Sequence, residues 1–167
     1  KVVNGYINDN SEIQRIENYY ITTINDLGKS RLTIKIMKDL AHLQAYYLNK
    51  PEEALELINS ALTITGIPPT LRYECKLEKG DILLILDDIW EATLIYAQVE
   101  QANKHNPIGH EAKFRKAKLA YYTGDFLWAQ AQLDILKAST SKLIANDAFE
   151  LSMLIKDNLQ DDSTGTA

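Results

Sequence analysis

Apolar side chains recur along this chain at the spacing of a helix, and no stretch alternates as a strand would. In the first such stretch Ile13, Ile16, Tyr20 and Ile24 fall on one side of a helix. An amphipathic helix needs this three-and-four spacing to bury one stripe and leave the rest in water. The pattern therefore predicts an all-α fold.

Glycine and proline separate the helical stretches. Gly28 ends the first stretch, Pro51 suits the first turn of a helix, and the segment from Gly66 to Pro69 is a break. The breaks predict eight helices, most of them joined into antiparallel pairs by short turns. Their expected ranges are 11–27, 30–48, 51–65, 70–86, 89–104, 109–122, 125–138 and 140–159.

An alanine recurs at Ala54, Ala92 and Ala129, at intervals of 38 and 37 residues. Apolar residues follow each alanine four and seven positions later, on the same helical face. They are Ile58, Tyr96 and Leu133 at the first spacing, and Ala61, Val99 and Leu136 at the second. Self-similarity at such a period predicts a helical solenoid, in which each unit buries its apolar face on its neighbours.

Small residues also recur at matched places before these alanines. Gly80 and Ala117 stand twelve positions before the second and third alanines, where a small side chain lets two helices approach closely. The first unit has His42 at that place, unless its loop is one residue longer and Ala41 takes the position. Nine positions before each alanine stand Ala45, Leu83 and Ala120.

These features resemble the tetratricopeptide repeat, whose units of about 34 residues carry small residues where paired helices cross. The stretch Ala117 to Ala129 is the nearest match. The segments Gly80-Asp81, Asp88 to Ala92, Gly109 to Phe114 and Gly124 to Ala131 resemble bacterial tetratricopeptide proteins whose function is not established. The resemblance spans about Leu32 to Ala138 and implies a right-handed superhelix of antiparallel helix pairs.

The expected organisation follows from this resemblance. A flexible segment, 1–10, precedes a helical domain, 11–159, and a disordered tail, 160–167, follows it. The repeat units are expected at about 32–66, 70–106 and 109–138, flanked by helices at 11–27 and 140–159. We expect the chain to be part of a longer bacterial protein, with its compartment left open.

In this family the first helix of each pair lines a concave groove. Matching the repeat positions of the family to those of this chain gives the expected groove residues. They are Tyr46, Tyr47, Glu74, Leu77, Asp81, Leu84, Glu111, Phe114, Lys118, Tyr121 and Tyr122. Tyrosine suits a peptide-binding surface because it offers a large contact area and a hydrogen-bonding hydroxyl. The alternative is that one Tyr of each pair packs between adjacent repeats.

Some members of the family hold a peptide's C-terminal carboxylate with Lys, Asn and Arg. The corresponding places here carry Leu77, Asp81, Phe114 and Lys118, so this clamp is absent. Acidic residues such as Glu74 and Glu111 favour a basic or mixed peptide instead. The alternative is an acidic face that is simply solvated.

Composition narrows the function further. The formal net charge of −5 argues against a nucleic-acid surface, which needs clustered Lys and Arg. The apolar runs are far shorter than the roughly 20 residues of a membrane span. The single cysteine, Cys75, and the three histidines, His42, His105 and His110, match no metal or catalytic pattern, so we expect no metal, cofactor or enzymatic activity.

Several other residues carry structural expectations. Asp87, Asp88 and Asp125 stand in turns between helices, where a carboxylate caps the next helix. Trp90 and Trp128 are expected to pack between repeats, and Cys75 to be a small core residue.

The function expected from the sequence is a non-catalytic protein-interaction module that binds a peptide or helix along the groove. The alternative is a structural spacer or oligomerisation segment. In that case exposed residues of the end helices, namely Ile13, Ile16, Leu151 and Leu154, would control self-association.

Overall fold

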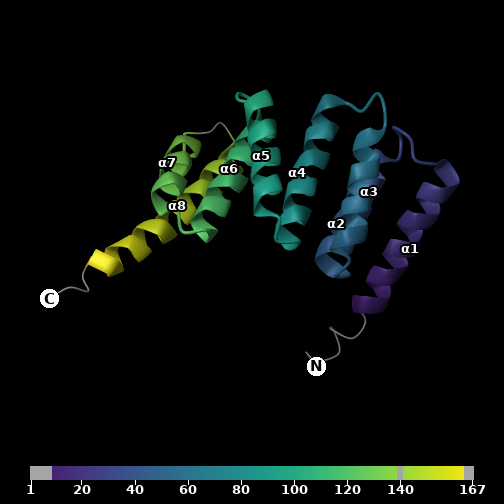
Figure 1. The fold of residues 1–167 in the computed structure, drawn as a ribbon, viewed down its shortest axis with the longest axis horizontal. Helices are drawn as coiled ribbons and strands as arrows, with labels where there is room; N and C mark the ends of the chain where they lie inside the picture. The colour runs from purple at the N-terminus through teal and green to yellow at the C-terminus, as the bar shows by residue number, and fades with distance from the viewer. Residues whose placement is uncertain (1–8, 139–140, 164–167) are drawn as a thin grey trace. The chain divides into compact units, whose positions relative to one another are not determined.

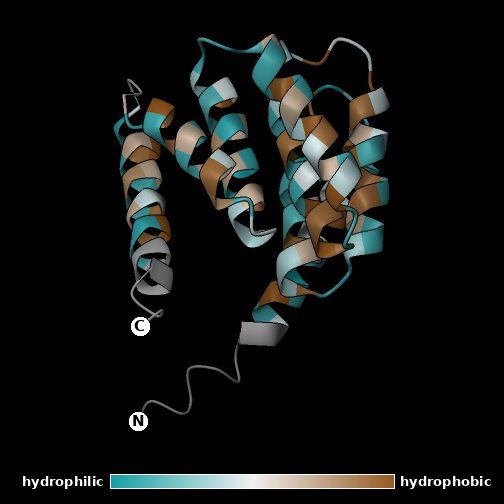
Figure 2. Cartoon of the chain, turned by 60° about the vertical axis from the view of Figure 1, so that its left-hand side comes forward, coloured by the Kyte–Doolittle hydropathy of each residue, from teal (hydrophilic) through white to brown (hydrophobic). Residues whose placement is uncertain are grey.

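The computed structural model describes residues 9–138 and 141–163. Eight α-helices and no strands occur in this described part of the chain, which confirms the all-α prediction. The helices are α1 (Asp9–Leu27), α2 (Ile34–Tyr47), α3 (Pro51–Thr63), α4 (Pro69–Ile85), α5 (Ile89–Ala102), α6 (Pro107–Tyr122), α7 (Phe126–Leu136) and α8 (Lys142–Ser163) (Figure 1). Apolar and polar residues are interspersed along them, as amphipathic helices require (Figure 2).

The chain divides into two compact units, Lys1–Ala92 and Thr93–Ala167, which we describe separately. In the first unit α2 packs on α1, α3 and α4, and α3 also packs on α4. In the second unit α6 packs on α7 and α8, and α7 also packs on α8. Each unit is thus built from sequential helices that pack on their neighbours.

The aligned repeat positions are all buried. Ala54, Ala92 and Ala129 and the residues four and seven positions after them are each no more than 1% exposed. This confirms that the repeated spacing marks the core side of α3, α5 and α7. In α2, Ala41 is 0% exposed while His42 is exposed, so Ala41 takes the small-residue position.

The start of α2 differs from the prediction. We expected this helix to begin at Ser30, but it begins at Ile34. The buried side chain of Thr33 explains the delay, because its Oγ1 accepts a hydrogen bond from Ser30 N at 2.9 Å and donates to Gly28 O at 2.8 Å. A threonine hydroxyl that bonds to nearby backbone in this way competes with helix formation.

The ends of the chain also differ from the prediction. The first helix begins at Asp9, inside the segment expected to be flexible. The last helix continues to Ser163, so the tail expected to be disordered is helical over 160–163. No glycine or proline occurs there before Gly165, so nothing in the sequence breaks the helix. Residues 1–8, 139–140 and 164–167 lie outside the described residues.

Two of the three expected aspartate caps are confirmed. Asp88 Oδ1 accepts a hydrogen bond from Glu91 N at 3.1 Å, and Asp125 Oδ1 accepts one from Trp128 N at 3.2 Å. Asp87 was expected to cap as well, and this is wrong. Its φ of 63° places it in the left-handed conformation that closes the end of α4, as Gly124 with φ 85° does after α6.

The prediction that both tryptophans pack between repeats is wrong. The Trp90 side chain is 78% exposed, and that of Trp128 is 36% exposed. Both follow an aspartate cap within the first turn of a helix, and the core side of that turn is taken by Ala92 and Ala129. Trp128 is partly covered by Lys116, whose Nζ lies 5.2 Å from the ring centroid.

Cys75 lies in the core of the first unit, as predicted, and is 0% exposed. Burial raises the pKa of its thiol to about 11. Because the thiolate is the reactive form, we expect Cys75 to react with a disulfide reagent at pH 8 at least about 100-fold more slowly in the native protein than in denaturant. Absorbance at 412 nm after addition of Ellman's reagent measures both rates, and similar rates would contradict the buried position.

Candidate protein-binding face

The first unit has a surface where polar and aromatic side chains of α2 and α4 meet. We call it the α2–α4 face and define it by Lys38, His42 and Tyr46 of α2 and Glu74, Glu78 and Asp81 of α4. Positions 74, 78 and 81 share one side of α4 because a helix turns once in about 3.6 residues. A hollow of about 440 Å³ adjoins this face, lined by Ile16, Tyr20, Lys38, Asp39, His42, Leu43 and Glu78.

Two polar contacts join α2 to α4 across this face. Lys38 Nζ lies 3.0 Å from Glu74 Oε2, and His42 Nδ1 lies 2.9 Å from Glu78 Oε1. The partners are 36 residues apart in both contacts, close to the repeat interval. Partly exposed ion pairs contribute only about 0 to 1 kcal/mol to stability, so their main consequence is the placement of charge.

Aromatic rings extend the face toward the end of α2. The Tyr46 ring stacks on His42 with a centroid distance of 4.4 Å and an interplanar angle of 31°. Tyr47 lies farther away, at 6.1 Å from the same imidazole. Both tyrosines are exposed, so the core of the first unit does not depend on either ring.

Charges on the face influence one another. Burial raises the pKa of Glu78, an effect that Asp81 strengthens and that the hydrogen bond from His42 opposes. Burial alone would lower the pKa of Lys38, but its hydrogen bond and ion pair with Glu74 outweigh burial and raise it. The two groups therefore sit in a partly dehydrated setting, where electrostatic interactions are stronger than in water.

The shift of Glu78 gives a prediction that can be tested by titration. A carboxylate with a higher pKa in the folded state than in the unfolded state makes the free energy of unfolding fall as pH rises. For Glu78 this fall starts below pH 4.5 and is complete above the pKa of the folded state. We expect the Glu78 side-chain carboxyl carbon to titrate with a midpoint above 4.5 in NMR spectra of the folded protein. A midpoint below 4.5 would contradict the burial of this group.

The sequence identified the acidic and tyrosine residues of this face and missed others. Glu74, Asp81 and Tyr46 were expected there, whereas Lys38, His42 and Glu78 were not. The signal was present, because Lys38 with Glu74 and His42 with Glu78 are two pairs of a nitrogen-bearing side chain and a glutamate at one common separation. Ile16 and Tyr20 of α1, which line the hollow, were predicted as part of the apolar side of the first helix but not as part of a binding face.

Leu77 is not available as a groove residue, contrary to the prediction. It is 4% exposed, and Leu84 is half-buried. The acidic side of α4 is narrow, because Leu77 flanks it on one side and the buried Cys75 and Ile82 flank it on the other. The alignment with the tetratricopeptide repeat does not show whether a residue at the border of the exposed side of a helix is itself buried.

The remaining expected groove residues lie on α6 in the second unit. Lys118 Nζ lies 5.9 Å from the Phe114 ring centroid, and Glu111 accepts a hydrogen bond from Arg115. Tyr121 packs partly on the core and lies 5.7 Å from the Phe126 ring, whereas Tyr122 is 74% exposed. In this pair one tyrosine packs and the other is free of the core, which is the alternative that the sequence left open.

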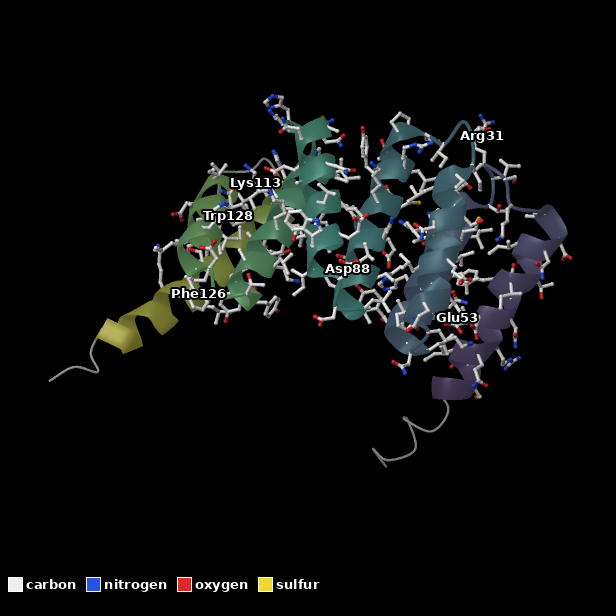
Figure 3. The ribbon with its side chains drawn as sticks, in the orientation of Figure 1. Arg31, Glu53, Asp88, Lys113, Phe126 and Trp128 are labelled. Carbon is white, nitrogen blue, oxygen red and sulfur yellow. The ribbon has the colours of Figure 1, made fainter. Side chains whose placement is uncertain are left out.

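The second unit has a further charged cluster that was not expected. Glu100 of α5 lies 3.4 Å from Lys113 Nζ and 3.0 Å from Lys116 Nζ of α6. Figure 3 labels Lys113 and Trp128 on neighbouring helices of this unit. These groups neutralise one another locally and leave α6 without an acidic stripe comparable to that of α4.

Two classes of site are not found among the described residues. No group of three or more His, Cys, Asp or Glu side chains over residues 9–138 and 141–163 is placed to hold a metal ion. Within the same residues, no helix combines the length and the apolar character that a membrane crossing requires.

Comparison with known proteins does not assign the chain to a family. No protein-family model matches the chain, and no match was found among the curated proteins or the solved structures.

Proposed function

We propose that this chain is a tetratricopeptide-like, non-catalytic protein-interaction module that binds a peptide or helix on the α2–α4 face. The observation that carries this proposal is the hollow of about 440 Å³ beside the exposed, stacked Tyr46 and His42. Such a site combines a recess for an apolar side chain with an aromatic contact surface, and aromatic anchors dominate the energetics of many interfaces.

The charges on the face favour a basic partner. Carboxylates of Asp39 and Glu78 line the hollow. Glu74 and Asp81 lie on the same side of α4 as Glu78, and Lys38, which also lines the hollow, pairs with Glu74. Lys or Arg side chains of a partner would add favourable electrostatic interactions at partly dehydrated carboxylates. Ile16, Tyr20 and Leu43 would contact an apolar side chain inserted between those basic residues.

Selection of peptides from a displayed random library tests the proposal. We expect the wild-type chain to enrich peptides with Lys or Arg flanking an apolar residue, and a fluorescence-anisotropy titration to give their affinity. A Tyr46→Ala, Glu74→Gln variant should bind the selected peptides at least about tenfold more weakly, because it loses an aromatic contact and a charge.

A matched variant controls for nonspecific effects of the same changes. Tyr19→Ala with Glu52→Gln removes an exposed tyrosine and a carboxylate from parts of the first unit that do not line the hollow. This control should bind as the wild type does. Equal losses in both variants, or enrichment of acidic peptides, would contradict the proposal.

A second candidate function is self-association through the end helices. Exposed apolar residues occur on α1 and α8, and they include Leu27 at 62%, Leu143 at 72%, Phe149 at 54% and Leu154 at 53%. Apolar surface of this kind favours contact with another protein surface. Sedimentation velocity tests this candidate, which requires a concentration-dependent dimer that Phe149→Ser with Leu154→Ser converts to monomer.

A further inference from the structure

The exposed side of α6 carries basic and aromatic side chains at helical spacing. Arg115, Lys118 and Tyr122 follow one another at intervals of three and four residues, which places them on one side of the helix. Lys118 is exposed, and the Tyr122 side chain is 74% exposed. We call these three residues the α6 stripe. The stripe presents both kinds of group, cationic and aromatic, that suit the acidic α2–α4 face and its hollow.

The α6 stripe has the opposite charge to the matching positions of α4. At the 37-residue interval of the repeat, Glu78 of α4 corresponds to Arg115 of α6, and Asp81 of α4 corresponds to Lys118 of α6. The two pairs of positions are three residues apart on either helix, so the spacing between the charges is the same. The chain therefore carries an acidic and a basic surface that match each other in charge and in helical spacing.

Each of the two surfaces has a charged group outside any ion pair. In the described part of the chain Lys118 forms no ion pair, and its Nζ lies 5.9 Å from the Phe114 ring centroid. Asp39, which lines the hollow of the α2–α4 face, is partly exposed and likewise forms no ion pair with a described residue. Arg115 is already bonded to Glu111, so Lys118 is the main cation of the stripe. A contact between Lys118 and Asp39 would add an ion pair without breaking one.

From this complementarity we infer that the α2–α4 face binds the α6 stripe of a second copy of this chain. The inference rests on the proposed function, because it names the partner of the same face. Lys118 of the second copy pairs with Asp39. Tyr122 of that copy, one helical turn later, enters the hollow of about 440 Å³ and contacts Ile16 and Leu43. This is the mode of recognition in which one side of a helix lies in a groove and is anchored at helical spacing.

The contact joins two different surfaces, so it is head-to-tail. Each copy has one face and one stripe, and repetition of the contact gives a ring if the rotation closes and an open chain if it does not. We expect the weight-average molar mass from sedimentation equilibrium to rise with protein concentration and to fall at high salt, since the contact depends on exposed charges. A chain that remains monomeric up to about 1 mM would overturn the inference.

Two blocked variants identify the surfaces. Lys118→Gln with Tyr122→Ala removes the stripe and keeps the face, whereas Asp39→Asn with Tyr46→Ala weakens the face and keeps the stripe. We expect each variant alone to self-associate at least about tenfold more weakly than the wild type. An equimolar mixture of the two should form a one-to-one pair with the wild-type affinity, because one intact face then meets one intact stripe. A mixture that associates no better than the separate variants would overturn the inference.

Two further variants control for changes elsewhere on the surface. Lys104→Gln with Leu127→Ala removes an exposed cation and an exposed apolar side chain that lie outside the α6 stripe, and it should associate as the wild type does. Phe149→Ser with Leu154→Ser should also leave the association unchanged. If this second variant abolishes it, the contact is made by the end helices, and the inference is wrong.

The basic peptides selected from the displayed library separate this inference from the proposed function. They should dissociate the assembly, because they occupy the same α2–α4 face. If they bind that face on a chain that stays monomeric, the partner is another protein; the inference then fails and the proposed function stands. If the chain stays monomeric and no peptide binds the face, both fail.

Discussion

Replacement of Tyr96 by alanine should lower the free energy of unfolding by about 4 kcal/mol, the range typical of a large aromatic side chain removed from a core. Tyr96 is 0% exposed and is the largest fully buried side chain among the described residues. It occupies the position four residues after Ala92, which the repeat spacing predicts to be buried. The substitution therefore leaves a cavity in the core. Urea unfolding followed by circular dichroism measures the change.

Leu94 provides the matched control, because it lies on the same helix and is 43% exposed. Leu94→Ala removes an apolar side chain without opening an internal cavity, and we expect a loss below about 1 kcal/mol. Equal losses for the two variants would mean that the four-residue spacing does not mark the buried side of α5. The repeat register would then have to be revised.

Gly109→Ala should lower the free energy of unfolding by about 3 kcal/mol, a loss typical of overpacking. A Cβ atom at this position would lie 2.0 Å from the Asn103 carbonyl oxygen and 2.6 Å from the Asn103 carbonyl carbon. Because both are backbone atoms, no side-chain rotation relieves the clash. Relief therefore requires a shift of α6 away from the end of α5.

The surroundings of Asn103 explain why that shift is costly. Asn103 is buried, its Nδ2 donates to Val99 O at 2.9 Å, and its own carbonyl oxygen accepts from Asn106 N at 2.9 Å. A displaced loop breaks these bonds and leaves polar groups without partners. Thermal unfolding measured by circular dichroism should show a clearly lower Tm for Gly109→Ala than for the wild type.

Gly124→Ala is the control for a general effect of adding a methyl group at glycine. Its φ of 85° disfavours alanine, but a Cβ there meets nothing within 4 Å. We expect a loss of only about 1 to 2 kcal/mol from the left-handed conformation. A loss from Gly109→Ala smaller than that from Gly124→Ala would contradict the close approach of α5 and α6.

The fold was predictable because its main determinant is periodic. The alanine repeats and the apolar residues after them identify the buried sides of three helices, and burial at matched positions confirms this. Helix ends were less predictable where one side chain decides them. Thr33 delays α2 through hydrogen bonds to Gly28 and Ser30, and a propensity argument does not reveal such a bond.

The candidate site was predictable only in part, because it depends on which side of a helix remains exposed. Glu74 and Asp81 were found because the register of the tetratricopeptide resemblance places both in the expected groove, and acidic residues rarely enter a core. Leu77 was wrongly expected in the groove because it borders the acidic side of α4. Trp90 was wrongly expected to pack between repeats because aromatic residues are usually buried. The contact of His42 with Glu78 required the pairing of α2 with α4, which only the tertiary structure provides.

The most direct test of the proposed binding face is an NMR footprint of a selected basic peptide on the intact chain. Backbone and side-chain signals are assigned, and the shifts on titration are placed on the structure. The proposal predicts that the largest shifts fall on Lys38, His42, Tyr46, Glu74 and Glu78, and that signals of α8 do not move. Shifts concentrated on α6 or α8, with none on α2 and α4, would contradict it.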